Sequence, residues 1–140
     1  MKRGRRQRAA ALIEFALAWP IALLIVFATV ESAVWASEVY AARAASLAGA
    51  RAGSVAGGTA ADAAAVAEQA LSPSLVGARP EIWCPDGSGP APDVWICAID
   101  QGTAIEVDVG GVAPALVPLL PGGGLPVSAQ AVLQKEVFAK

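Results

Sequence analysis

A basic tract followed by a long apolar run opens the chain, and this order constrains the fold more than any other feature. Five of the ten basic residues precede residue 9, and they are Lys2, Arg3, Arg5, Arg6 and Arg8. Residues 9–30 are then almost wholly apolar and carry one charge, Glu14. This order is typical of a membrane-insertion signal. A carboxylate inside such a run is costly and needs a functional explanation.

Charge and composition exclude several classes of function. The net charge is −2, but residues 1–8 carry +5, so the rest of the chain is acidic. An acidic body argues against a nucleic-acid partner. The chain has no His, so Ser–His and Cys–His catalysis lack a base. A His/Cys metal site would need more ligands than the two Cys provide. We therefore predict a protein that is not an enzyme and has no cofactor or metal.

The apolar run has the length of a membrane span once its flanks are included. Residues 15–30 are uncharged and would form a helix of about 24 Å at ~1.5 Å per residue. The hydrocarbon core is about 30 Å thick, so apolar residues on both sides must contribute. We predict a transmembrane helix over residues 10–36, with Pro20 bending it and with Trp35 and Tyr40 at the outer interface. The basic residues predict a cytoplasmic N-terminus and an extracytoplasmic C-terminus.

Three fates are open to this segment. It stays as a permanent anchor, or a signal peptidase removes it after Ala36, or only a basic leader over residues 1–9 is removed and the apolar helix stays. The third fate is prepilin-type processing.

The opening of the chain resembles a known family. Residues 5–20 combine a basic leader, a small residue at a cleavage position and an apolar run containing Pro. After cleavage, the fifth residue of the mature chain would be a Glu and the sixth an aromatic. This pattern is similar to that of TadE-like pseudopilins of bacterial tight-adherence (Tad) pili. Here Ala9 stands at the position that is usually Gly, Glu14 is the glutamate and Phe15 the aromatic. Residues 41–52 and, less specifically, 125–136 resemble the rest of the family.

The resemblance implies roles and partners. A prepilin peptidase would cut between Ala9 and Ala10, and Glu14 and Phe15 would act in assembly. In pilin-like assembly the glutamate meets the free amine of a neighbouring subunit, an ion pair that gains strength in a low dielectric. The partners implied are other pilin-like subunits, the inner-membrane assembly platform, the peptidase and the lipid bilayer. The location implied is the inner membrane, as a single-pass protein, and on assembly a surface fibre. The alternative is that Glu14 rests in the headgroup layer.

Beyond the span we expect a helical region over residues 37–72. Its first helix is rich in Ala, a strong helix former, and ends at Gly57-Gly58. Thr59 and Asp62 predict a capping box for a second helix that runs to about Leu71. Gly49 and Gly53 form a GxxxG motif, which we interpret as a product of composition rather than as a helix contact, because the motif acts mainly inside membranes.

Residues 73–140 change to a strand pattern. Strands are predicted over four short segments, namely residues 82–84, 94–99, 105–109 and 127–138. Ile105, Val107 and Val109 alternate with Glu106 and Asp108, which indicates a sheet with one buried face and a solvated acidic face. The class predicted is α+β, with a small antiparallel sheet of three to four strands.

Two further features lie in this region. Residues 110–126 hold four prolines and are expected not to form a regular strand; they would be a loop over the sheet or a contact for another subunit. Cys84 and Cys97 flank a Pro- and Gly-rich loop, and we expect a disulfide at the base of a hairpin.

The function expected is that of a minor pseudopilin in Tad-pilus assembly, without catalysis. The alternative is a secreted or membrane-anchored extracytoplasmic module that binds a ligand and has no link to pili.

Overall fold

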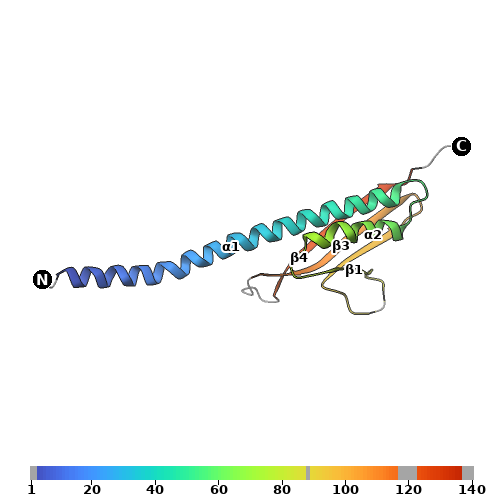
Figure 1. Cartoon of the computed structure of the whole chain (residues 1–140). Coiled ribbons are helices and arrows are strands. Elements are labelled where there is room, and N and C mark those ends of the chain that lie inside the picture. Colours follow the sequence, from blue (N-terminus) through green and yellow to red (C-terminus); the bar gives the residue numbers. More distant parts are fainter. Residues whose placement is uncertain (1–2, 88, 117–122, 137–140) are drawn as a thin grey trace. The chain divides into compact units, whose positions relative to one another are not determined.

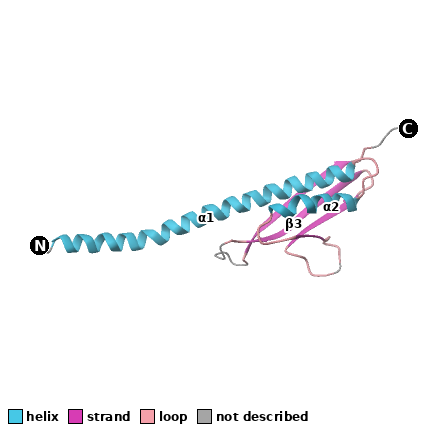
Figure 2. Ribbon diagram, in the orientation of Figure 1, coloured by secondary structure: helices cyan, strands magenta, loops and turns pink. Residues whose placement is uncertain are grey.

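The protein is an α+β chain, as the sequence predicts. The computed structural model describes residues 3–87, 89–116 and 123–136, with side chains from residue 13 onward. It divides into two compact units, Met1–Ala33 and Val34–Lys140. Its elements, in chain order, are α1 (Arg3–Ser54), α2 (Ala60–Leu71), a 3-10 turn η1 (Ser72–Ser74), β1 (Pro80–Ile82), β2 (Val94–Asp100), β3 (Ala104–Pro114) and β4 (Gly124–Gln134) (Figures 1 and 2).

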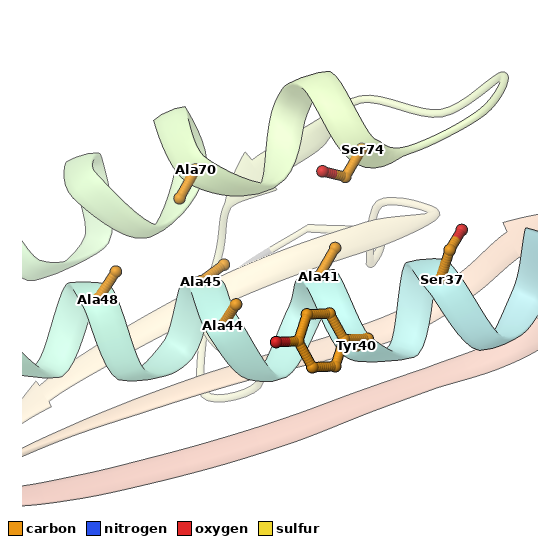
Figure 3. Close-up of a pocket in the computed structure, with 8 residues that line it drawn as sticks. All are labelled: Ser37, Tyr40, Ala41, Ala44, Ala45, Ala48, Ala70 and Ser74. Atoms are coloured by element: carbon orange, nitrogen blue, oxygen red, sulfur yellow. The ribbon is translucent and has the colours of Figure 1, made fainter.

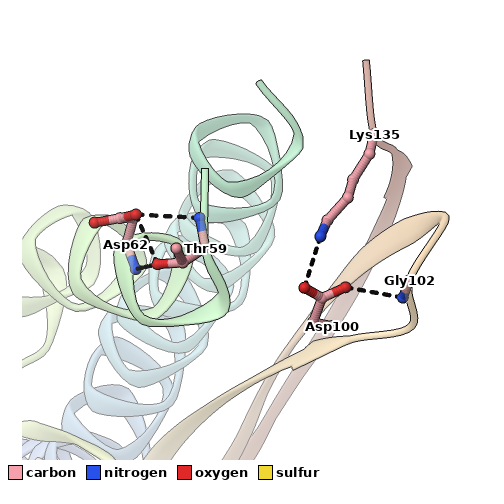
Figure 4. Close-up of polar contacts among 5 residues, drawn as sticks. All are labelled: Thr59, Asp62, Asp100, Gly102 and Lys135. Atoms are coloured by element: carbon pink, nitrogen blue, oxygen red, sulfur yellow. Dashed lines mark hydrogen bonds and ion pairs between the residues drawn. The ribbon is translucent and has the colours of Figure 1, made fainter. Parts of the chain in front are cut away.

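The first helix begins earlier than predicted, at Arg3, but it ends, and the second helix begins, close to where the sequence predicts. α1 runs without interruption through Pro20 and stops at Ser54. The turn after it uses Gly57 at φ +82°, a conformation that glycine adopts at little cost, and Gly58 N–H donates to the Val55 carbonyl at 2.9 Å. Thr59 then forms the predicted capping box with Asp62 (Figure 4). Each side chain bonds the other residue's backbone N–H at 3.1 Å, so two helix-end donors are satisfied.

The sheet has four strands in the order β1-β2-β3-β4, and it is mixed rather than antiparallel. β2, β3 and β4 form antiparallel pairs, whereas β1 runs parallel to β2, with Ile82 beside Ile96. The prediction of a wholly antiparallel sheet was therefore wrong at β1. The physical reason is that the chain between β1 and β2 is long enough to return to the start of β2, so no hairpin is needed.

Cys84 and Cys97 form a disulfide, although not at a hairpin base. Their Cα atoms are 4.8 Å apart, within the usual range. Because β1 and β2 are parallel, the bond joins Cys84, two residues after the end of β1, to the middle of β2. On the same side, Trp83 packs edge-on against Trp95, with ring centroids 5.9 Å apart. The disulfide and this aromatic pair together hold a strand of three residues against the sheet.

Part of the proline-rich segment is regular strand, contrary to expectation. β3 continues to Pro114 and β4 begins at Gly124, so both ends of residues 110–126 belong to the sheet. Gly110 is needed there because a Cβ atom would lie 2.4 Å from the Trp95 ring. Pro126 is tolerated because β4 is an edge strand. Residues 117–122 and the last part of the predicted strand 127–138 lie outside the described residues.

One face of the sheet carries the core. Ile105, Val107 and Val109 are all buried, which confirms the alternation read from the sequence. They pack with Ile96, Val94 and Val127 from neighbouring strands. The helices close this face with small side chains and one large one, Ala42, Ala45, Ala50, Ala63, Ala67 and Leu71. Figures 1 and 2 show α2 and the C-terminal part of α1 on the same side of the strands.

The GxxxG motif is a helix contact, so its interpretation as mere composition was wrong. A Cβ atom on Gly49 would lie 2.5 Å from the Ala63 carbonyl oxygen and 2.9 Å from Ala67 Cβ. A Cβ atom on Gly53 would lie 2.9 Å from Ala63 Cβ and 3.0 Å from Ile105 Cγ2. Both glycines therefore let α1 approach α2 and the sheet closely, outside the apolar run.

We expect Gly53→Ala to destabilise the Val34–Lys140 unit by about 1–3 kcal/mol, because overpacking outweighs the gain in helix propensity. Chemical unfolding of the full chain in detergent measures this. The double variant Gly53→Ala with Ala63→Gly removes the methyl that clashes. Its loss should be smaller than the sum of the two single losses, and additive losses would contradict the close contact.

Removal of the disulfide by Cys84→Ser with Cys97→Ser should lower the free energy of unfolding by roughly 3 kcal/mol, as chain-entropy models give for a loop of this length. Non-reducing mass analysis of the wild-type chain from membranes should find no free thiol. Two free thiols in native material would contradict the bond.

Candidate functional site

The first candidate site is the apolar stretch of α1 that carries the predicted processing and assembly residues. Ala9 and Ala10 lie in the helical backbone of α1, and their side chains are outside the description. Every described side chain over residues 13–30 is exposed. The stretch is long and apolar enough to cross a membrane, with a mean hydropathy of 2.2. A helix that is apolar on all sides and unburied by its own chain needs lipid or other helices around it.

Glu14 and Phe15 lie together on this stretch. Phe15 is 65% exposed and stacks on Trp19, with ring centroids 5.8 Å apart. Among the described side chains none pairs with the Glu14 carboxylate. Compensation for that charge in an apolar setting therefore has to come from outside the described part of the chain.

Trp35 has a role that the sequence did not predict. Its indole Nε1 donates to the Pro126 carbonyl at 2.9 Å, so it ties α1 to the start of β4. Tyr40, the other predicted interfacial anchor, is 75% exposed. A long-range bond such as the one from Trp35 leaves no signal in the sequence, because the two partners are far apart along the chain.

A hollow of about 510 Å³ lies between α1 and the α2–η1 segment. In Figure 3, Ala41, Ala45 and Ala48 point from α1 toward the opposite helix, where Ala70 points back. The full lining is Ser37, Tyr40, Ala41, Ala44, Ala45, Ala48, Ala70 and Ser74. The lining holds no charged group, and its hydroxyls come from Tyr40, Ser37 and Ser74. Such a surface accepts an apolar side chain better than a charged ligand.

Glu38 is a carboxylate that sequence reasoning missed. It is only 3% exposed, and its Oε1 accepts the Val76 N–H at 3.0 Å. Buried acidic residues are rare unless they are hydrogen-bonded. Here the bond attaches the segment between η1 and β1 to α1. The sequence offers no signal for this, because Glu38 reads as an ordinary polar residue of an Ala-rich helix.

The acidic outer face of the sheet is a hydrogen-bonded network. Gln101 and Gln130 both donate to Glu106. Burial, and then the Glu106 charge, raise the pKa of Asp108, while a hydrogen bond with Gln130 lowers it. At the end of the sheet, hydrogen bonds from Lys135 and Gly102 lower the pKa of Asp100 (Figure 4). Within the described residues, no group of three or more acidic or Cys side chains is placed to hold a metal ion.

No family model, no curated protein and no solved structure matches this chain.

The two shifted aspartates predict opposite effects of pH. The folded pKa of Asp108 lies above the ordinary value of 3.8, so its stabilising effect is complete below 3.8 and is lost as the pH rises through the folded pKa. Asp108→Asn should therefore raise the free energy of unfolding at pH 7 relative to wild type, and this gain should shrink in acid.

Asp100→Asn is the matched variant, and it should change the free energy of unfolding at pH 7 in the opposite direction. Its folded pKa is lowered, so its contribution is present above 3.8 and is lost as the pH falls. Asp100→Asn should weaken the fold at pH 7 and have less effect in acid. Chemical unfolding at several pH values tests both, and equal pH profiles for the two variants would contradict the assignment.

Proposed function

We propose that this chain is a membrane-anchored structural subunit, a minor pseudopilin of a Tad-type pilus, and that it works by assembly without catalysis. The observation that carries the proposal is Glu14, the one charge in an otherwise apolar stretch over residues 9–30, in which the described side chains, from residue 13 onward, are exposed. The sequence pattern around it, with Ala9 before and Phe15 after, resembles TadE-like pseudopilins. The proposal places the N-terminus in the cytoplasm and the Val34–Lys140 unit outside the inner membrane.

The mechanism proposed for Glu14 is electrostatic. Cleavage after Ala9 frees the amine of Ala10, and an amine of this kind on a neighbouring subunit pairs with the Glu14 carboxylate. In a low dielectric such a pair is strong, and a charge left without its partner is heavily penalised. Phe15, stacked on Trp19, belongs to the apolar surface that surrounds the pair. The pair thus sets the register of one helix against another.

The architecture of the second unit supports a role in assembly. Four of its carboxylates are engaged in hydrogen bonds, namely Glu38, Asp62, Asp100 and Glu106. Its hollow at Ala41 and Ala70 is lined mostly by small side chains. These features suit packing between proteins. The partners proposed are other pilin-like subunits, the assembly platform, a prepilin peptidase and the surrounding lipid.

The mature N-terminus separates this proposal from its alternative. Intact mass of the chain from membranes should give a start at Ala10. A start at Ser37 would favour the secreted ligand-binding module, and a start at Met1 a permanent anchor.

Glu14→Gln should leave membrane insertion intact, because removing a charge from the apolar run favours the bilayer. Assembly should nevertheless fall, since the neighbour's amine is left buried without its partner, at a cost of about 3–5 kcal/mol. The measurement is the number of assembled pili, or of cross-linked subunits, at equal membrane levels.

Two matched variants accompany it. Glu14→Asp keeps the charge and should retain more assembly than Glu14→Gln. Glu31→Gln removes a carboxylate at the other end of the apolar run, where the family pattern implies no amine, and should assemble normally. Wild-type assembly by Glu14→Gln would refute the ion-pair mechanism.

A further inference from the structure

The last strand, β4, is a long sheet edge without charged residues. Gly124–Gln134 holds eleven residues, none of them Asp, Glu, Lys or Arg. Soluble proteins usually protect such an edge with charges, bulges or a covering segment, because its free N–H and C=O groups can pair with another chain. Among the described residues, protection of β4 comes from Pro126, close to the start of the strand, and from bonds between α1 and the two ends of the strand.

The hydrogen bonds fix which β4 groups face outward. Lys135 N–H donates to the Thr103 carbonyl, so the odd-numbered residues of β4 face β3. The even-numbered ones face away, and the chain itself occupies two of these positions. The Pro126 carbonyl accepts from Trp35, and Glu136 N–H donates to the Ser54 carbonyl.

Between these two capped ends lie four residues whose backbone N–H and C=O point outward, namely Ser128, Gln130, Val132 and Gln134. All four are exposed, and in the described part of the chain no backbone group pairs with their outer edge. An edge of this kind binds an added strand through main-chain hydrogen bonds.

The direction of the strand restricts what can be added. Trp35 lies by Pro126 and Ser54 lies by Glu136, so β4 runs in the same direction as this part of α1. Antiparallel pairing of β4 with β4 of a second copy would point residues 35–54 of the two α1 helices in opposite directions. Parallel pairing keeps these two helix parts in one direction, with their starts at the same end. The strand of a second copy that meets this condition is one that runs parallel to β4.

The opposite edge of the sheet supplies such a strand. β1 is parallel to β2, and β2 is parallel to β4 because β3 is antiparallel to both. Trp83 N–H donates to the Ile96 carbonyl, so its neighbour Ile82 directs its N–H and C=O to the free edge. Ile82 is 53% exposed and lies on the helix-covered side of the sheet. The odd-numbered β4 residues on that side, Ala129 and Ala131, are half-buried.

We propose that β4 of one copy pairs in parallel with β1 of a second copy, with Ile82 opposite Ala129 or Ala131. This inference rests on the proposed function, since it requires copies that share one membrane. Ile82 closes the exposed apolar end of the neighbour's core, and Glu81 comes to lie on the outer face near Ser128 or Gln130. The contact is heterologous, so it does not close on itself and extends a row of subunits. β1 is short, so the pairing is weak in solution and depends on the high local concentration in a membrane.

The test uses the full chain, made with and without ¹⁵N, mixed in equal amounts in phospholipid vesicles. A photoreactive phenylalanine analogue replaces Val132, which is exposed on the β4 edge. The expected result is cross-links between heavy and light chains that join position 132 to residues 79–84. Heavy–light cross-links confined to residues 128–134, or the absence of heavy–light cross-links, would overturn the proposal.

Two pairs of variants, each made with the photoreactive residue at position 132, test the pairing further. Ile82→Pro removes one edge N–H without touching a bond to β2, and it should lower the heavy–light yield about fivefold or more. Ile82→Val keeps the donor and the apolar side chain and should have little effect. Ser128→Glu should lower the yield through repulsion by the neighbour's Glu81, while Ser128→Lys should not. Equal yields from the Glu and Lys variants would contradict the pairing, even where Ile82→Pro fails to fold.

The cross-linking test and the Glu14 assembly test can fail independently of each other. If Glu14-dependent assembly is found but no link between β4 and β1 forms, this inference fails and the pseudopilin proposal stands. If the link forms while Glu14→Gln assembles normally, the edge pairing stands and the ion-pair mechanism falls.

Discussion

One helix, α1, has to satisfy two different environments, and the rest of the structure depends on how it does so. Over residues 13–30 its side chains are exposed and, apart from Glu14 and Thr29, apolar, so this stretch is suited to lipid or to packing against other helices. From Ala42 onward the same helix contributes side chains to a packed core. Alanine serves this second part well, since it favours helix and leaves room for close approach. Gly49 and Gly53 then allow α2 and the sheet to come within contact distance of the helix backbone.

The sheet depends in turn on contacts that hold its edges. β1 has three residues and would be a weak strand by itself. The Cys84–Cys97 bond and the Trp83–Trp95 contact fix it beside β2. At the other edge, Trp35 and Ser54 of α1 hold the two ends of β4. The antiparallel pairing with β3 sets the direction of β4, and the two bonds to α1 align the strand with residues 35–54 of the helix.

The two proposed contacts depend on different interactions in different surroundings. Glu14 acts through charge in an apolar setting, where an unpaired carboxylate is expensive. The β4 edge acts through backbone hydrogen bonds in an aqueous setting, where each bond contributes modestly and many copies in one membrane supply the concentration. Two carboxylates of the second unit serve as structural groups, with Glu38 holding the segment before β1 and Asp100 pairing with Lys135.

The sequence by itself determined the features that depend on near neighbours. The apolar run, the ends of both helices, the Thr59–Asp62 cap and the alternation of Ile105, Val107 and Val109 follow from local patterns, and the structure contains each of them. The class α+β follows from the change of period between helices and strands. The pairing of Cys84 with Cys97 was predictable because there are only two cysteines.

Only the tertiary structure decided the features that depend on contacts between distant residues. The parallel direction of β1 depends on the path of the loop after Trp83, and composition does not encode that path. The roles of Gly49 and Gly53 depend on Ala63 and Ile105, which belong to other elements. The bond from Trp35 to Pro126 and the burial of Glu38 likewise depend on residues far away in the sequence, and the sequence predicted neither. A local pattern specifies which conformation a segment favours, but the partner that a side chain meets is set by how the segments pack in space.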